Sequence, residues 1–387
     1  GRGEMAPSSD VDLLFLTPYK ITPWAESVIE SMLYMLWDLK LKVGHSTRTI
    51  DDCIRLSKND TTIRTALLEA RFIFGDQNLF LELQRRFGKD VVQGSGTDYV
   101  EMKLAERDER HQRFGDSRYV NEPNLKEGKG GMRDLHTLTW IAKYVYRVAD
   151  VGDLVERGIM TAAEYRRFVK AERFLWSVRF HLHLLTNRPE ERLTFDVQTE
   201  LAKRLGYTDH AGAQAIERFM KHYYLVARDI GDLTRVICSS IEAENQKKPL
   251  FRLPRFGLRT KQIDGFVAEG SWLNVEDEEL FAEDPVAMLR IFQVAQANDL
   301  DIHPDAHRLL RRHRKKINRA VRNDPAANRC FLDIMTSRKD PETHLRRMSE
   351  AGILGQFITD FGRVVAQTQH DMYHHYTVDE HTLRAVG

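Results

Sequence analysis

The first fifty residues change between strand-like and helix-like patterns of apolar positions. From Asp10 to Phe15 the chain has period-two patterning, with apolar residues at 11, 13 and 15, and this pattern, which ends at Thr17-Pro18, predicts a strand. Thr22-Pro23 has the form of a helix start, and apolar residues recur at helical spacing over 23–36. The segment 38–43 alternates again, and Gly44 is expected to end this second strand. Strand, helix and strand make the smallest α/β unit.

From residue 49 onward the pattern is almost wholly helical. Thr49 and Asp60 are typical helix caps, and Thr161 with Glu164 predicts a capping box that opens a helix to about residue 185. One later stretch, about 255–275, has the spacing of a short hairpin or small sheet. Further long amphipathic helices are predicted at 98–115, 132–149, 213–243, 284–298 and 304–320. The predicted fold class is α+β and mostly helical, with a small α/β head on a large helical body.

Length, charge and cysteine content exclude several classes of protein. The 387 residues, enough for about two or three domains, hold 58 Lys+Arg against 57 Asp+Glu, a formal net charge of +1. Such a chain has no overall field for nucleic acid or an anionic membrane, which argues against both as partners. No apolar run approaches the ~20 residues of a membrane span and no signal pattern opens the chain, so a cytoplasmic location is expected. Three scattered cysteines support neither disulfides nor a zinc site.

Two aspartates interrupt the first predicted strand. Because strand side chains alternate between faces, Asp10 and Asp12 should project from the same face, about 7 Å apart at the backbone. Carboxylate oxygens suit Mg²⁺, which binds one or two carboxylates together with substrate phosphates. If the strand predicted at 38–43 lies beside the first, Asp38 joins them, and three carboxylates can hold two metal ions for phosphoryl or nucleotidyl transfer. The alternative is a solvated strand face.

A segment rich in glycine and serine comes just before these aspartates. Its small residues allow backbone N–H groups to approach a phosphate, which favours the catalytic reading of the aspartate pair. The residues concerned are Gly1, Arg2, Gly3, Ser8 and Ser9.

The loop from Lys126 to Asp134 is a second candidate site. Glycines 128, 130 and 131 lie among Lys126, Lys129 and Arg133, directly before a predicted helix. Free N–H groups at a helix start, with cations beside them, can bind an anion. The alternative is a glycine-rich turn that only redirects the chain.

Three other groups of residues are not assigned to an active site. The basic run over 308–322 spreads around its helix and lacks interleaved aromatic residues, so a solvated face or a face for an acidic partner is expected. A long helix carries Arg173, Arg179, His181 and His183, for which internal ion pairing is expected and no functional role is assigned. His370-Asp371 has the form of a metal-binding His-Asp pair and is interpreted as a coincidence.

Five separated stretches match the motifs of one enzyme family. They are GRGEMAPSSDVDLL at 1–14, WDLKLKVGHS at 37–46, NEPNLKEGKGGMRDL at 121–135, RLTFD at 192–196 and YTVDEHTL at 376–383. Together they resemble the bifunctional uridylyltransferase/uridylyl-removing enzymes that act on the nitrogen-regulatory protein PII. The likeness spans essentially the whole chain. It implies transfer of UMP from UTP to a tyrosine hydroxyl of PII, in nitrogen and glutamine signalling.

The resemblance also assigns residues. It implies that Asp10, Asp12 and Asp38 are the catalytic carboxylates that bind Mg²⁺, and that His381 is the first metal ligand of a hydrolase domain. It gives nucleotide binding to Gly1, Arg2, Gly3, Ser8, Ser9, Lys126, Gly130, Gly131 and Arg133.

Three domains follow from the same resemblance. Residues 1–115 would form a nucleotidyltransferase domain, 116–345 a helical linker domain, and 346–387 the start of an HD-type phosphohydrolase domain. The first is expected to be N-terminally incomplete, because the family carries a glycine pair and an aromatic residue just ahead of the position of Gly1. The third is expected to be truncated, so uridylyl-removing activity should be absent.

Two alternative functions stay open at this point. One is an enzyme similar to tRNA nucleotidyltransferases, which would need salt-sensitive tRNA binding. The other is a non-catalytic module that binds the nucleotide or PII without turnover.

Overall fold

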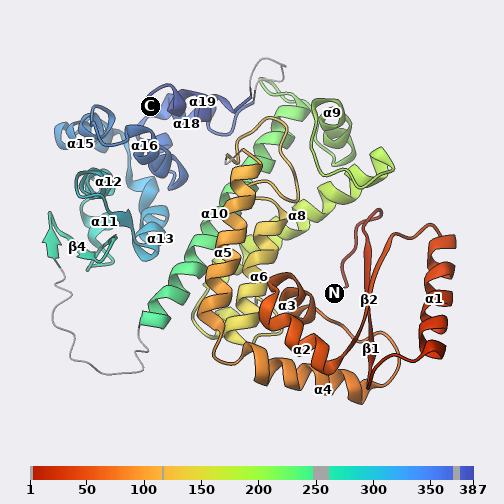
Figure 1. Cartoon of the computed structure of the whole chain (residues 1–387). Coiled ribbons are helices and arrows are strands. Elements are labelled where there is room, and N and C mark those ends of the chain that lie inside the picture. The colour runs from red at the N-terminus through yellow and green to blue at the C-terminus, as the bar shows by residue number, and fades with distance from the viewer. Residues whose placement is uncertain (1–2, 116, 247–260, 369–374) are drawn as a thin grey trace, which may run out of the picture. The chain divides into compact units, whose positions relative to one another are not determined.

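The computed structural model describes residues 3–115, 117–246, 261–368 and 375–387, which form two compact units (Figure 1). The first unit holds residues 1–116 and 124–192, and the second holds 117–123 and 193–387. Helices dominate both, as the α+β prediction requires.

The first unit opens with the predicted α/β element. Strand β1 (Val11–Thr17), helix α1 (Pro23–Asp38) and strand β2 (Val43–Thr49) follow one another, and the strands pair in parallel. Thr22 caps α1 by accepting a hydrogen bond from the Ala25 N–H at 3.3 Å. In Figure 1 α1 lies to one side of the β1–β2 pair.

The prediction of a strand at 38–43 is wrong. Helix α1 continues through Asp38, and the chain leaves it at Lys40, whose φ is +62°. The paired strand begins only at Val43, and Gly44 lies inside it instead of ending it. Six residues with alternating polarity fit the last turn of a helix and the segment after it as well as they fit a strand. The β-branched residues that follow favour an extended conformation and so set where β2 forms.

Helices complete the first unit. Thr49, Asp60 and Asp76 cap helices as local signals predict, and the capping box of Thr161 and Glu164 is present. In Figure 1 α5, α6 and α8 run side by side. The helices are α2 (Ile50–Asn59), α3 (Thr61–Leu68), α4 (Gln77–Phe87), α5 (Gly96–Arg113), α6 (Met132–Tyr146), α7 (Asp153–Glu156) and α8 (Ala162–Thr186), with a π-helical turn at Gly88–Val92.

A small apolar core joins α2, α4, α5 and α6. Tyr99 and Tyr144 stack with ring centroids 3.8 Å apart and an interplanar angle of 14°. Around them pack Ile54, Phe87, Val91, Val92 and Trp140.

The second unit contains a small sheet and many short helices. Strands β3 (Lys261–Ile263), β4 (Phe266–Glu269) and β5 (Trp272–Asn274) are antiparallel neighbours, which confirms the hairpin expected within 255–275. Residues 255–260 of that prediction lie outside the described residues. Strand β6 (Asp301–Ile302) joins β5 in parallel. It was not predicted, because two residues carry no alternation.

The helices that follow β5 share one apolar core, in which Met288, Leu289 and Phe292 of α12 are fully buried. The single helix predicted at 304–320 is wrong. α13 ends at His313, a 3₁₀ turn follows, and Asn318 caps a new helix, with its Oδ1 accepting from the Ala320 N–H at 2.9 Å. The helices are α9 (Phe195–Arg204), α10 (Ala215–Gln246), α11 (Leu280–Glu283), α12 (Ala287–Ala297), α13 (Pro304–His313), α14 (Arg319–Arg322), α15 (Pro325–Met335), α16 (Pro341–Glu350), α17 (Leu354–Phe357), α18 (Thr359–Val364) and α19 (Val378–Arg384).

Within the described ranges, none of these helices combines the length and the apolar character that crossing a membrane requires.

Candidate active site

The aspartate pair lies where β1 begins. Asp10 directly precedes the strand, Asp12 is its second residue, and both side chains are exposed. In the parallel register Asp12 is opposite Gly44 of β2. A Cβ atom placed on Gly44 would come 2.7 Å from Asp12 Oδ1. The glycine therefore makes room for the carboxylate, which extends over the neighbouring strand with its oxygens open to a ligand.

Asp38 occupies a different place from the one predicted. It is the last residue of α1 and is exposed, instead of lying on the polar face of a strand beside Asp12. Among the described residues, no three His, Cys, Asp or Glu side chains converge to hold a metal ion. The structure thus places Asp10 and Asp12 at the start of β1 and leaves Asp38 at a helix C-terminus, where a negative charge is disfavoured unless a cation offsets it.

The segment before Asp10 forms a closed turn. The Ser9 hydroxyl accepts from the Ala6 N–H at 3.1 Å, and the Ser9 N–H donates to the Ala6 carbonyl at 3.0 Å. Gly3 has φ of +86°, a value that favours glycine. Gly1 and Arg2, both predicted to bind the nucleotide, lie outside the described residues.

The glycine loop uses its own backbone. The Gly130 N–H donates to Asp134 Oδ2 at 2.8 Å, and the Met132 and Arg133 N–H groups donate to carbonyls of the same loop at 2.9 Å each. The Gly131 N–H also donates within the loop, to the Gly128 carbonyl at 2.9 Å. These four amides are occupied, so an anion at this part of the loop would depend on side-chain cations such as those of Lys126 and Arg133.

Close backbone packing explains two of these glycines. A Cβ on Gly128 would lie 2.5 Å from the Asn124 carbonyl oxygen, and one on Gly131 would lie 2.7 Å from that of Leu125. Gly130 has φ of +78°. These glycines therefore allow the tight turn of the loop, which is the structural role that the sequence left open as an alternative to anion binding.

A buried charge cluster fixes the start of α6. Asp134, 3% exposed, pairs with Arg110 and accepts from His111 Nε2 at 2.9 Å. Burial raises the pKa of Asp134, but the His111 hydrogen bond and the charges of His111 and Arg110 outweigh it and hold that pKa below its ordinary value. Glu127 balances the loop's cations, with 3.1 Å to Arg133 and 3.9 Å to Lys126.

Lys103 of α5 adds a further cation near this loop. Its side chain is 3% exposed, bonds to Glu106 at 2.7 Å and lies 4.6 Å from the Trp140 ring centroid. Burial lowers the pKa of Lys103, with smaller effects from the neighbouring charges. The sequence did not single out Lys103, because a lysine on a helix carries no signal of burial.

His183, to which the sequence assigned no functional role, makes a contact that was not predicted. The expected internal ion pair exists, since Arg179 contacts Glu191 at 2.5 Å. The structure adds that His183 Nδ1 accepts from the Ser8 N–H at 3.3 Å, in the turn ahead of the aspartates. No spacing along the chain could reveal a contact between residues 175 positions apart.

His381, the predicted first hydrolase ligand, is exposed on α19. The neighbouring Asp379 is buried, and burial raises its pKa, offset in part by hydrogen bonds from Thr377 and backbone N–H groups. His370-Asp371 lies outside the described residues. The hydrolase role of His381 stays a prediction.

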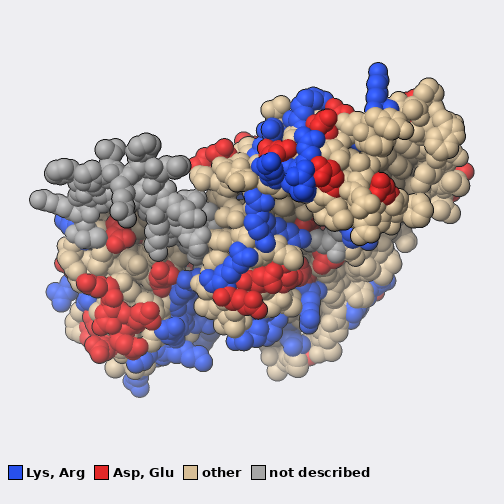
Figure 2. Space-filling view, turned by 90° about the horizontal axis from the view of Figure 1, so that it is seen from below, with Lys and Arg blue, Asp and Glu red and all other residues tan. Residues whose placement is uncertain are grey.

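The basic run over 308–322 has partners within the second unit. Arg308 pairs with Asp305 at 2.8 Å, and Arg311 pairs with Asp229 at 2.9 Å and with Asp232. On the face shown in Figure 2, Lys and Arg side chains lie among Asp and Glu side chains. Arg308 and Arg311 are therefore engaged in ion pairs within the second unit itself, which the sequence did not predict.

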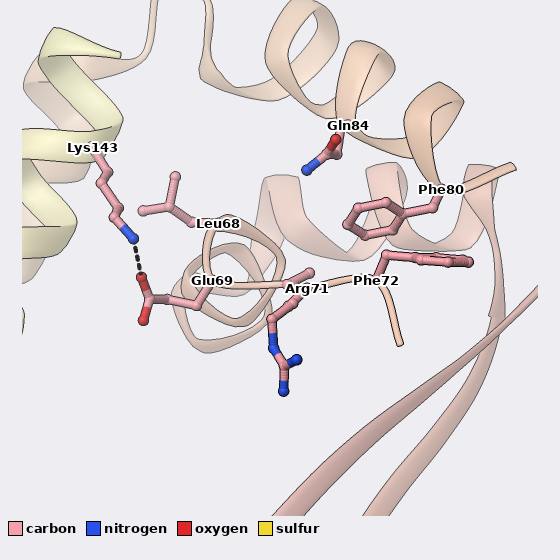
Figure 3. A pocket seen from close by; sticks show the side chains of 8 residues that line it. Leu68, Glu69, Arg71, Phe72, Phe80, Gln84 and Lys143 are labelled. Carbon is pink, nitrogen blue, oxygen red and sulfur yellow. Dashed lines mark hydrogen bonds and ion pairs between the residues drawn. The ribbon is translucent and has the colours of Figure 1, made fainter. Parts of the chain in front are cut away.

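A cavity of about 280 Å³ opens beside α3, α4 and α6, away from any residue predicted from sequence. The rings of Phe72 and Phe80 form one side, with centroids 5.8 Å apart, and the Lys143–Glu69 ion pair of 3.1 Å forms another (Figure 3).

Comparisons with known proteins add the family context. A model of GlnD PII-uridylyltransferase matches residues 98–238, and a model of the uridylyltransferase GlnD third domain matches residues 266–357. Neither reaches Asp10 and Asp12. No solved structure matches the chain.

Two curated relatives match the whole chain. Both are named bifunctional uridylyltransferase/uridylyl-removing enzyme. The one from Azospirillum brasilense is 59% identical over 389 residues, which cover 100% of this chain and 42% of the relative. The one from Rhodospirillum rubrum is 54% identical over 387 residues, which cover 100% of this chain and 41% of the relative. The chain spans about two fifths of the length of these relatives.

Proposed function

Because this chain belongs to the PII-uridylyltransferase family, we propose that it transfers UMP from UTP to a tyrosine hydroxyl of the nitrogen-regulatory protein PII. UTP and PII are then its substrates and Mg²⁺ its cofactor. The observation that carries the proposal is the placing of Asp10 and Asp12 at the start of β1, with Gly44 leaving space for the Asp12 carboxylate.

The residues at this place suit a hard divalent cation. Asp10, directly before β1, and Asp12, its second residue, both offer exposed carboxylates. Bound Mg²⁺ would supply charge neutralisation for the triphosphate and the leaving pyrophosphate. Asp38 enters as a third carboxylate through the family resemblance, and its position at the end of α1 does not itself support that role.

The protein's own contribution is to bind and orient. Lys126 and Arg133 offer side-chain cations for phosphate oxygens, in a loop whose backbone is fixed by its own hydrogen bonds. The tyrosine oxygen attacks the α-phosphorus of UTP, and the bond from that phosphorus to pyrophosphate breaks. The phenolic proton leaves to a carboxylate, for which the resemblance offers Asp38.

Replacement of the paired carboxylates tests the proposal. Asp10→Asn and Asp12→Asn should each lower the rate of labelled UMP transfer to PII by about 100-fold or more, because each removes a charged ligand while keeping the side-chain shape. Both side chains are exposed, so the helical circular dichroism should stay unchanged. Glu30→Gln, an exposed carboxylate change on α1, is the matched control and should keep full activity. Full transfer by the double variant would refute the site.

A binding measurement separates catalysis from mere recognition. Calorimetry with UTP and Mg²⁺, beside the turnover assay, should show binding and transfer in the unmodified chain. Binding of UTP without any transfer to PII would instead support the non-catalytic module.

A further inference from the structure

The turn that leads into the aspartates is attached to a buried histidine of α8. The Ser8 N–H donates to His183 Nδ1 at 3.3 Å, and Ser8 lies two residues before Asp10. The His183 side chain is completely buried. A contact from a buried ring to a backbone amide restricts that amide far more than an exposed contact does.

The tautomer of His183 follows from its neighbours. Since Nδ1 accepts from Ser8, the neutral ring carries its proton on Nε2. Nε2 faces Glu191 Oε1 at 3.5 Å. Burial lowers the pKa of His183, offset in part by the charge of Glu191, so the ring is neutral and keeps Nδ1 as an acceptor.

Glu191 is itself fixed from two sides. Arg179 Nε lies 3.0 Å and 3.1 Å from its two carboxylate oxygens. Its backbone carbonyl accepts from the Leu125 N–H at 2.6 Å, immediately before Lys126. The bridge between Asn124 and Arg192 lies beside this bond. Glu191 therefore connects His183 to the start of the glycine loop.

From these contacts we infer that His183 is a positioning residue for uridylyl transfer, which ties the turn before Asp10 to the loop that carries Lys126 and Arg133. The inference rests on the proposed function. His183 does not touch the nucleotide in this assignment; it acts through the Ser8 backbone on one side and through Glu191 on the other. It sets the spacing between the metal-binding carboxylates and the phosphate-binding cations.

Kinetics of position 183 variants test this role. His183→Ala removes the acceptor and should lower kcat about tenfold or more, with KM for UTP changed less than about threefold, because orientation is lost and nucleotide contacts are kept. His183→Asn places an amide oxygen near the position of Nδ1 and should restore kcat to within about threefold of the unmodified chain. His181→Asn, two residues away on the same helix, is the matched control and should have no effect.

Three outcomes would overturn the inference. One is a kcat for His183→Ala equal to that of His181→Asn. Another is an Asn variant that folds yet loses as much kcat as the Ala variant, since His183 would then act by packing alone. The third is an effect confined to KM.

Hydrogen exchange keeps this test separate from that of the proposed function. The Ser8 amide should exchange about tenfold or more faster in His183→Ala than in the unmodified chain, and the Asn variant should restore protection. If the unmodified chain transfers no UMP, the proposed function fails, and the exchange rate alone decides whether His183 holds this turn. Equal Ser8 exchange in all variants overturns the attachment.

Discussion

Gly44 faces Asp12 across the parallel pair of β1 and β2, and the carboxylate fills the space that a side chain at position 44 would need. The sequence pattern predicted Asp10 and Asp12 on one strand; Asp12 lies within β1, and Asp10 directly precedes it. It assigned Gly44 to a strand end, since the partner across a sheet depends on register, which local pattern does not specify. The contact between His183 and Ser8 was not predicted for the same reason, because the two residues are distant along the chain.

Gly44→Ala is the residue-scale test of this arrangement. The added methyl would meet Asp12 Oδ1 at 2.7 Å and push the carboxylate aside, so UMP transfer should fall about tenfold or more. Position 44 is exposed, and the free energy of unfolding in urea should change by less than about 1 kcal/mol. Gly96→Ala, where the nearest atom to a new Cβ is 4.0 Å away, should leave activity intact. An undiminished rate in Gly44→Ala would show that the Asp12 position is not critical.

Helix caps were the most predictable elements, and short alternating segments the least. Thr49, Asp60 and the Thr161–Glu164 box are each decided within four residues, and all are present. The pattern of residues 38–43 fitted both a strand and the end of a helix. Because these residues were assigned to a strand, Asp38 was expected on that strand, whereas it is the last residue of α1. At the glycine loop, the sequence pattern predicted where α6 begins, but it did not indicate that the backbone amides of the loop are engaged in hydrogen bonds. The Gly130 amide donates to the Asp134 carboxylate and the next three amides donate to nearby carbonyls, contacts that apolar periodicity does not indicate.

Asp134 provides the element-scale prediction, because it joins α5, α6 and the loop between them. Asp134→Asn should lower the free energy of unfolding by about 3 kcal/mol, since it removes the buried partner of Arg110 and His111. Urea denaturation at neutral pH measures this. Asp108→Asn, on the exposed side of α5 with 59% of its side chain accessible, should cost less than about 0.5 kcal/mol. Equal stability of the two variants would contradict a structural role for Asp134.

The lowered pKa of Asp134 predicts that the folded protein loses stability as the pH becomes acidic. Asp134 has a lower pKa folded than its ordinary value of 3.8, so the folded state favours the charged carboxylate. Its stabilisation is complete above that ordinary value and is lost as the pH falls through the lowered native pKa. Unfolding measured from pH 6 to pH 2 should therefore show a smaller acid-side loss of stability in Asp134→Asn than in the unmodified chain. An unchanged slope would indicate that Asp134 is not charged in the folded protein.

At the scale of the whole molecule, the periodicity of apolar residues predicted the mostly helical class and left the arrangement of the helices open. A formal net charge of +1 agrees with basic and acidic side chains that lie among one another (Figure 2). The head and body boundaries at 115 and 345 stay predictions, because the compact units follow packing and include segments that are not contiguous in sequence. The basic run illustrates the same limit, since its acidic partners on α10 lie about eighty residues earlier in the chain.

Product analysis of PII is the measurement that tests the central claim most directly. The chain is incubated with PII, UTP and Mg²⁺, and PII is then examined by mass spectrometry with site assignment. Our account predicts the addition of one UMP to a tyrosine of PII by the unmodified chain and by Glu30→Gln, and none by Asp12→Asn. Unmodified PII from the active preparation, or UMP transfer by Asp12→Asn at the unmodified rate, would contradict it.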